Sequence, residues 1–231
     1  VDRVSFQVSE GEFVGVMGAS GSGKTTLLNM LATIDSVTAG HIYYQETDIT
    51  ELKPDQLAKF RKENLGFVFQ EYNLLDTLTI GENIVLAMTL QNKSKKEIQK
   101  GSEEMMRLLG IWEIRNQFPY QVSGGQKQRC ACARALINHP KLLLADEPTG
   151  ALDSKAAETL LETFQSLNAS KRATIFMVTH DAFSASYCSR ILFLKDGRIF
   201  HELIRGQKGR REFLNAILDV LSATGGVKDA R

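Results

Sequence analysis

Short apolar runs separated by longer mixed segments set the pattern of this chain. Five runs predict buried strands: EFVGVMG at 12–18, LGFVFQ at 65–70, KLLLAD at 141–146, ATIFMVTH at 173–180 and RILFLKDG at 190–197. VSFQV at 4–8 predicts another strand, and RIFHEL at 198–203 predicts a hairpin return. Because several runs are apolar on both faces and alternate with helices, we expect a largely parallel sheet covered on both sides.

Helical periodicity fills most of the remaining chain. Helices are expected over TTLLNMLATI at 25–34 and over 154–169, and helical signals dominate 73–138. The tail from 206 starts polar and basic and then offers an apolar face, which we expect to pack on the domain's own surface. The residues at helical spacing are Ile98, Met105, Leu109 and Trp112 in the central block, and Phe213, Leu214, Ile217, Leu218 and Leu221 in the tail.

The composition argues against a nucleic-acid-binding protein and a membrane-spanning protein. The 231 residues include 28 basic and 27 acidic side chains, so overall charge favours no nucleic-acid partner. No run of 18 apolar residues predicts a membrane span, and no signal peptide is recognised. The chain opens at Val1 inside an expected strand, so we expect the natural start to lie upstream. Cys130, Cys132 and Cys188 lack the paired spacing of a metal site and are expected to be buried thiols.

A glycine-rich loop between the first strand and the first helix predicts phosphate binding. The segment GASGSGKT fits G-x-x-x-x-G-K-[ST] in the strand–loop–helix context that this motif requires. Glycines let backbone N–H groups surround an anion, and the helix N-terminus adds partial positive charge. We expect Lys24 to reach the β- and γ-phosphates and Thr25 to bind Mg²⁺. The nucleotide-binding residues predicted here are Gly18, Ala19, Ser20, Gly21, Ser22, Gly23, Lys24, Thr25 and Thr26.

Polar side chains at other strand ends predict the chemistry beside this loop. Asp146, at the end of a buried strand, is placed to hold magnesium. Glu147 points elsewhere and is a candidate to accept a proton from water attacking the γ-phosphate. Gln70 ends its strand in the same way and is expected to reach the metal or that water. His180 ends a fourth strand as a polar cap or a catalytic group.

Six motifs in order make the chain resemble the ATPase domain of ABC transporters: GASGSGKT, the FVFQ glutamine, VSGGQ, LLLADE, GALD and VTHD. The resemblance covers essentially the whole chain. It implies an α/β fold with a P-loop NTPase (RecA-like) core, a mostly parallel sheet, an inserted α-helical subdomain and an antiparallel edge. The implied divisions are a core of 1–72 and 139–205, a helical subdomain of 73–138, and a tail of 206–231.

The same resemblance implies a head-to-tail homodimer that encloses ATP and Mg²⁺. Each ATP would lie between the phosphate loop of one subunit and the VSGGQ segment of the other. Two adjacent glycines begin a helix poorly unless the backbone must approach a ligand closely, and this arrangement supplies that reason. The residues implied across the interface are Ser123, Gly124, Gly125, Gln126 and Asp153, with His180 contacting the γ-phosphate.

Within the family, TIDSVTAG, QEYNLLDTLT and ASYCSRILFLKDG look most like the bacitracin-export subgroup, as does a C-terminal helix ending in GGV. This likeness implies resistance to antimicrobial peptides, or their sensing with an indirect link to a sensor kinase. It also implies a membrane permease of the FtsX-like type that docks on Gln70–Leu75 and the helical subdomain. The subunit would then lie on the cytoplasmic face of a bacterial plasma membrane.

Other functional classes of ATPase share some of these motifs and are alternatives to the bacitracin-export subgroup. An ATPase of a lipoprotein-release, macrolide-export or cell-division system is the nearest. A chromosome-maintenance ATPase would carry a long coiled coil between the phosphate loop and VSGGQ, but only about a hundred residues intervene without heptads. A ribosome-acting protein would carry two heads. A binding module without turnover is disfavoured by Glu147 and His180.

Overall fold

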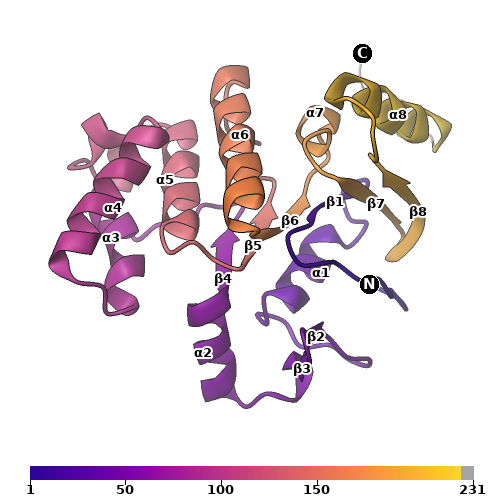
Figure 1. Ribbon diagram of the computed structural model, residues 1–231, viewed down its shortest axis with the longest axis horizontal. Coiled ribbons are helices and arrows are strands. Elements are labelled where there is room, and N and C mark those ends of the chain that lie inside the picture. The colour runs from indigo at the N-terminus through magenta and orange to yellow at the C-terminus, as the bar shows by residue number, and fades with distance from the viewer. Residues whose placement is uncertain (225–231) are drawn as a thin grey trace.

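A six-stranded sheet organises the computed structural model, which describes residues 1–224 (Figure 1). The strand order is β4-β5-β6-β1-β7-β8; the first five strands are parallel, and β8 pairs with β7 in the antiparallel sense. The predicted parallel sheet with an antiparallel edge is therefore confirmed. The strands are β1 Phe13–Met17, β4 Leu65–Val68, β5 Leu142–Asp146, β6 Thr174–Val178, β7 Arg190–Lys195 and β8 Arg198–Ile204.

Helices cover both faces of this sheet, as the doubly apolar strands predict. On one face Leu27 and Leu28 of α1 pack against alternate residues of the central strands, such as Val14 and Val16. On the other face α5, α6 and α8 pack against residues such as Phe13 and Met17. The helices are α1 Lys24–Leu31, α2 Pro54–Asn64, α3 Ile80–Leu90, α4 Lys95–Leu108, α5 Gly124–Leu136, α6 Ser154–Lys171, α7 Ala182–Ala185 and α8 Arg210–Ala223.

The central helical block forms a group beside β4, seen at the left of Figure 1. Ser94 and Glu97 begin α4 with a capping box, which satisfies backbone donors of its first turn. Met105 and Leu109 are buried between the helices, and Trp112 packs against the same core. The helical content of 73–138 is thus confirmed, while the boundaries of the predicted subdivisions stay a prediction.

The tail helix packs on the domain, but not on the whole predicted face. Phe213 and Ile217 are fully buried, and α8 lies against α7. Arg210 also stacks over the Tyr187 ring at 4.5 Å. Leu218, however, is 43 % exposed, so its predicted place on the buried face is wrong. The two buried residues lie one helical turn apart. The GGV segment at 225–227 lies outside the described residues.

The predicted strand at 4–8 is absent from the structure. Val4, Phe6 and Val8 keep their alternation but pack on the α1 side of the sheet, where Phe6 stacks on Phe176 at 5.7 Å. The carbonyl of Gln7 accepts from the Arg190 side chain, not from a neighbouring strand. The segment therefore covers the sheet without joining it.

Residues 32–64 hold elements that the apolar pattern did not predict. A two-stranded sheet pairs β2 (Tyr43–Tyr44) with β3 (Thr47–Asp48), and α2 follows. Strands of two residues are too short for alternation to be visible. In α2 only Phe60 is buried, so its sequence has no apolar stripe.

The cysteines and the lengths of the helices agree with the sequence analysis. Cys130, Cys132 and Cys188 are buried free thiols, as predicted, and burial raises the pKa of Cys130 to about 12. Among residues 1–224, no helix has the length and apolar character needed to cross a membrane.

Candidate active site

A cleft of about 740 Å³ opens at the carboxyl ends of four adjacent parallel strands, β4, β5, β6 and β1. Such an edge is where open α/β sheets bind ligands. The structure brings most of the predicted site residues together here, although they are up to about 160 positions apart. The lining residues are Gly18, Ala19, Ser20, Gly21, Gly23, Lys24, Thr25, Thr26, Gln70, Tyr72, Gln128, Asp146, Glu147, Gly150, Ala151 and His180.

The loop between β1 and α1 is shaped as an anion cradle. Gly23 precedes α1 with φ +100°, a conformation that favours glycine, and it caps the helix without a side-chain hydrogen bond. The first N–H groups of α1 are therefore free of side-chain caps. A Cβ on Gly18 would lie 2.2 Å from the Leu194 carbonyl oxygen, so only glycine fits there. Ser22 is predicted to bind nucleotide but is buried and does not line the cleft.

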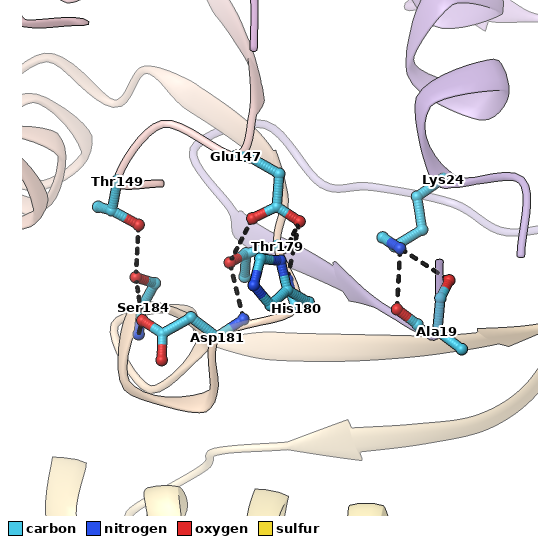
Figure 2. Close-up of polar contacts among 9 residues, drawn as sticks. Ala19, Lys24, Glu147, Thr149, Thr179, His180, Asp181 and Ser184 are labelled. Atoms are coloured by element: carbon cyan, nitrogen blue, oxygen red, sulfur yellow. Dashed lines mark hydrogen bonds and ion pairs between the residues drawn. The ribbon is translucent and has the colours of Figure 1, made fainter. Parts of the chain in front are cut away.

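Lys24 brings a full positive charge into this cradle. Its Nζ donates to the carbonyl oxygens of Gly18 (2.8 Å) and Ala19 (3.0 Å), as Figure 2 shows for Ala19. These bonds curl the side chain back over the loop. The residue is 9 % exposed, so its charge interacts with an anion in a partly desolvated setting.

Asp146 is a buried acid that suits a hard cation. It is 4 % exposed, and within the described chain its Oδ1 has no hydrogen-bond partner. Burial and the neighbouring Glu147 raise the pKa of the Asp146 carboxyl, against the opposing effects of Thr25 and Lys24. Thr25, Asp146 and Gln70 offer oxygen atoms, the ligands that Mg²⁺ prefers. The residues therefore fit magnesium, as the sequence predicts.

Glu147 and His180, which follow the adjacent strands β5 and β6, point toward each other (Figure 2). Glu147 Oε1 lies 2.8 Å from His180 Nδ1 and accepts the His180 backbone N–H at 3.0 Å. The Thr179 hydroxyl donates to Glu147 Oε2 at 3.2 Å. Glu147 itself has φ +47°, which costs an L-residue energy and points to a site that fixes its orientation. The His180 side chain remains 73 % exposed.

Gln70 lies two residues beyond β4 and lines the cleft. The turn that follows it is unusual, because Tyr72 and Asn73 both have positive φ. Arg134 of α5 holds this turn through the Tyr72 carbonyl at 2.8 Å and the Asn73 carbonyl. Gln70 is therefore connected to the helical block through its own loop.

The predicted interface residues are not among the residues that line the cleft, although Gly124 and Gly125 border it next to Tyr72 and Ala151. Ser123 caps α5, accepting from Gln126 N–H at 3.3 Å, while Gln126 Oε1 accepts from Ser123 N–H at 2.8 Å. This reciprocal pair leaves the N–H groups of Gly124 and Gly125 at the open end of the helix. A Cβ on Gly125 would also lie 3.0 Å from the Ala151 carbonyl oxygen of the same chain. Packing within the same chain therefore explains part of the requirement for glycine at position 125.

Asp153, predicted to connect two sites, caps α6. The Asp153 Oδ1 accepts from Ala156 N–H at 2.9 Å, and Asp153 is exposed. This capping bond explains an acid at that position without a second subunit.

The sequence did not predict site roles for Gly150 and Ala151 of the GALD motif, nor for Tyr72, Gln128 and Thr179. Gln128 is 1 % exposed and lines the cleft from α5. Thr179 supports Glu147 from directly before His180. A hydroxyl residue beside a strand-end histidine was the available signal for Thr179. No sequence signal marks Tyr72 or Gln128.

Comparison with known proteins agrees with this geometry. A family model described as ABC transporter matches residues 1–150. The bacitracin export ATP-binding protein BceA of Halalkalibacterium halodurans is 50 % identical over 98 % of this chain and 89 % of its own length. The ABC transporter ATP-binding protein YxdL of Bacillus subtilis is 52 % identical over 97 % of this chain and 87 % of its own length.

A solved structure gives the same result for the fold. The ATP-binding cassette MJ0796 of Methanocaldococcus jannaschii, a dimer in a post-hydrolysis state with ADP and Pi, superposes with a TM-score of 0.84. It is 40 % identical, and the match covers 87 % of this chain and 88 % of that one. The phosphate cradle, the acid pair and these similarities agree, and the chain belongs to the ABC transporter family as an ATP-binding, ATP-hydrolysing subunit.

Proposed function

We propose that this subunit drives a peptide-handling permease by closing and opening a homodimer around two ATP molecules. The observation that carries the proposal is the gathering of Lys24, Asp146, Glu147 and His180 in one cleft. This set provides phosphate binding, oxygen ligands and a candidate base within one site.

In the proposed reaction Lys24 and the N-terminus of α1 bind the phosphates and offset their charge. Glu147 accepts a proton from the attacking water, and His180 orients Glu147 while lying near the γ-phosphate. Thr25, Asp146 and Gln70 would hold Mg²⁺, which supplies charge neutralisation on the phosphate oxygens when bound. The strained backbone at Glu147 supports this assignment, since strain of that kind concentrates at functional sites.

The segment Ser123–Gly125 is proposed to bind the ATP held by the partner subunit. It does not line its own cleft but borders it, and it presents a helix N-terminus with two glycines. Gln126 would lie at the same junction, and Asp153 would connect the two sites. ATP then favours the closed dimer by its differential affinity, and loss of the γ-phosphate reverses this preference.

The substrate class is proposed from the relatives. BceA is named for bacitracin export, and we infer a related role in resistance to antimicrobial peptides or in their sensing. The permease would dock on Gln70–Leu75 and the helical block and place the subunit on the cytoplasmic face of the membrane. The turn after Gln70 supports this docking, because Leu75 is 47 % exposed. A lipoprotein-release, macrolide-export or cell-division system is the alternative.

Deletion and complementation in the host test both levels of this proposal. Deleting the gene should increase sensitivity to bacitracin-like or lantibiotic peptides, and the wild-type gene should restore resistance. Glu147→Gln should not restore it, because the variant binds ATP and closes but lacks the base. Its purified form should trap an ATP-dependent dimer with turnover reduced at least about a hundredfold.

Glu162→Gln is the matched control, since Glu162 is an exposed acid on α6; it should restore resistance fully. Unchanged peptide sensitivity after deletion would remove the peptide assignment. Rapid hydrolysis by the Glu147→Gln protein would remove Glu147 from the role of base.

A further inference from the structure

Two buried hydroxyls connect the turn after β5 with helix α7, which follows β6 (Figure 2). Thr149 is 8 % exposed and Ser184 is fully buried, and their Oγ atoms lie 2.9 Å apart. Neither residue lines the cleft. Their contact connects the segment that starts at Glu147 with the segment that carries His180.

The direction of this hydrogen bond follows from counting protons. The single hydroxyl proton of Ser184 is donated to Asp181 Oδ2 at 2.6 Å. Ser184 therefore accepts from Thr149, and Thr149 is the donor. The same Asp181 carboxylate also accepts the backbone N–H groups of Ser184 at 2.9 Å and Phe183 at 3.1 Å.

The chain of hydrogen bonds continues back to Glu147. Asp181 N–H donates to the Thr179 hydroxyl at 3.1 Å, and that hydroxyl donates to Glu147 Oε2 at 3.2 Å. The links Thr149–Ser184, Ser184–Asp181, Asp181–Thr179 and Thr179–Glu147 all run in one sense. The Ser184 and Thr179 hydroxyls each accept one bond and donate another, so each couples its two neighbours. Asp181 joins these two halves through its carboxylate on one side and its backbone N–H on the other. The chain starts two residues after Glu147 and ends on its carboxylate, so it closes a ring.

We propose that Thr149 and Ser184 are positioning residues for ATP hydrolysis. Their hydrogen bond fastens the 147–149 turn to the start of α7 and the His180 segment before it, so that Glu147 and His180 keep their mutual geometry when the dimer closes. The same fastening transmits movement of the following segment, 150–153, to the His180 loop. This inference depends on the proposed role of Glu147.

Thr149→Val tests the hydroxyl while keeping the shape of the side chain. We expect kcat for ATP hydrolysis by the full-length chain to fall about three- to tenfold, the range for one lost hydrogen bond. The KM for ATP should stay near the wild-type value, because neither hydroxyl lines the cleft. Thr149→Ser returns the donor and should restore kcat.

Thr163→Val is a matched control. Thr163 is 7 % exposed and its hydroxyl donates to the Thr159 carbonyl at 2.8 Å within α6. Its substitution removes an equally buried hydroxyl without affecting the ring, so kcat should not change. A wild-type kcat for Thr149→Val, or a loss that Thr149→Ser does not rescue, would overturn the inference.

Ser184→Ala provides a second test from the other side of the bond. It should lower kcat at least as much as Thr149→Val does, because it removes both the link to Thr149 and the hydroxyl donor to Asp181. The double variant Thr149→Val/Ser184→Ala should lose no more than Ser184→Ala alone, since that variant already removes the bond to Thr149. Multiplied losses in the double variant would show that the two hydroxyls act independently and would refute the proposal.

Failure of this inference can be told from failure of the proposed function. If Glu147→Gln abolishes hydrolysis while Thr149→Val and Ser184→Ala leave kcat unchanged, the base role survives and the positioning role is wrong. If Glu147→Gln hydrolyses ATP freely, the role of the base itself is wrong.

Discussion

Asp146 and Glu147 are neighbours in sequence with different surroundings. Asp146 completes β5 with a buried carboxyl, whereas Glu147 turns out of the strand at positive φ and meets His180. Successive residues of a strand point to opposite sides, and here the strained backbone at Glu147 sends the second acid along the cleft. Two carboxyl groups thus enter one site with separate partners.

Asp146→Asn should stabilise the nucleotide-free protein while it abolishes hydrolysis. Burial raises the pKa of the Asp146 carboxyl above its ordinary value of 3.8, so the charged form is disfavoured by folding. That cost is full at pH values above the raised pKa, decreases as the pH falls through it, and is gone only below the ordinary value of 3.8. We expect the melting temperature near neutral pH to rise by about 2–4 °C. The gain should shrink as the pH is lowered.

Scanning calorimetry of both proteins at several pH values, without nucleotide or magnesium, measures this effect. Asp35→Asn is the control, because Asp35 is exposed and should give no gain. A lower melting temperature for Asp146→Asn at neutral pH would contradict the predicted cost of burying this charge.

At the scale of elements, α8 shows how a predicted face can be only partly correct. Its apolar residues follow helical spacing, but the contact with α7 and the sheet buries Phe213 and Ile217 and leaves Leu218 at the margin. Spacing identifies which residues share a side of a helix. The width of the neighbouring surface determines how many of them are covered.

Phe213→Ala should therefore destabilise the protein far more than Leu218→Ala. Removing the fully buried ring leaves a cavity and should cost about 3–5 kcal/mol in the free energy of unfolding. Truncating Leu218, at 43 % exposure, should change it by about 0.5 kcal/mol or less. Urea unfolding followed by circular dichroism measures both. Equal losses would indicate that Leu218 is covered in solution.

At the scale of the whole molecule, the site residues fall into two groups. The phosphate loop, Gln70, Asp146, Glu147 and His180 share a cleft, while the Ser123–Gly125 segment lies outside its lining. The division matches the proposal that the second group binds the nucleotide of a partner subunit. The dimeric state of the related MJ0796 cassette supports a second subunit as the missing part.

Mixing two inactive variants tests the shared site. Lys24→Ala should lose nucleotide binding, and Ser123→Arg should block the partner's site, so neither protein alone should hydrolyse ATP. A mixed dimer has one intact composite site, and equal mixing should restore about a quarter of the sites. Steady-state ATPase assays of the mixture measure the recovery.

The control mixes Lys24→Ala with the double variant Lys24→Ala/Ser123→Arg, which has no intact combination and should stay inactive. Hydrolysis by Ser123→Arg alone would contradict a nucleotide held between subunits.

The sequence by itself determined the features whose physical requirements are local. A phosphate cradle needs glycines, a lysine and a helix N-terminus in one short stretch, and buried parallel strands need unbroken apolar runs. The phosphate loop, the buried strands of the parallel sheet and the polar side chains at their ends could all be predicted for that reason.

Only the tertiary structure decided which distant segments touch. The alternation at 4–8 is compatible with a strand, yet its neighbours make it a cover over the sheet. The Thr149–Ser184 bond, the hold of Arg134 on the turn after Gln70 and the exposure of Leu218 depend on packing between elements far apart in sequence. Such contacts are set by the summed geometry of the fold, and no local pattern of residue types specifies them.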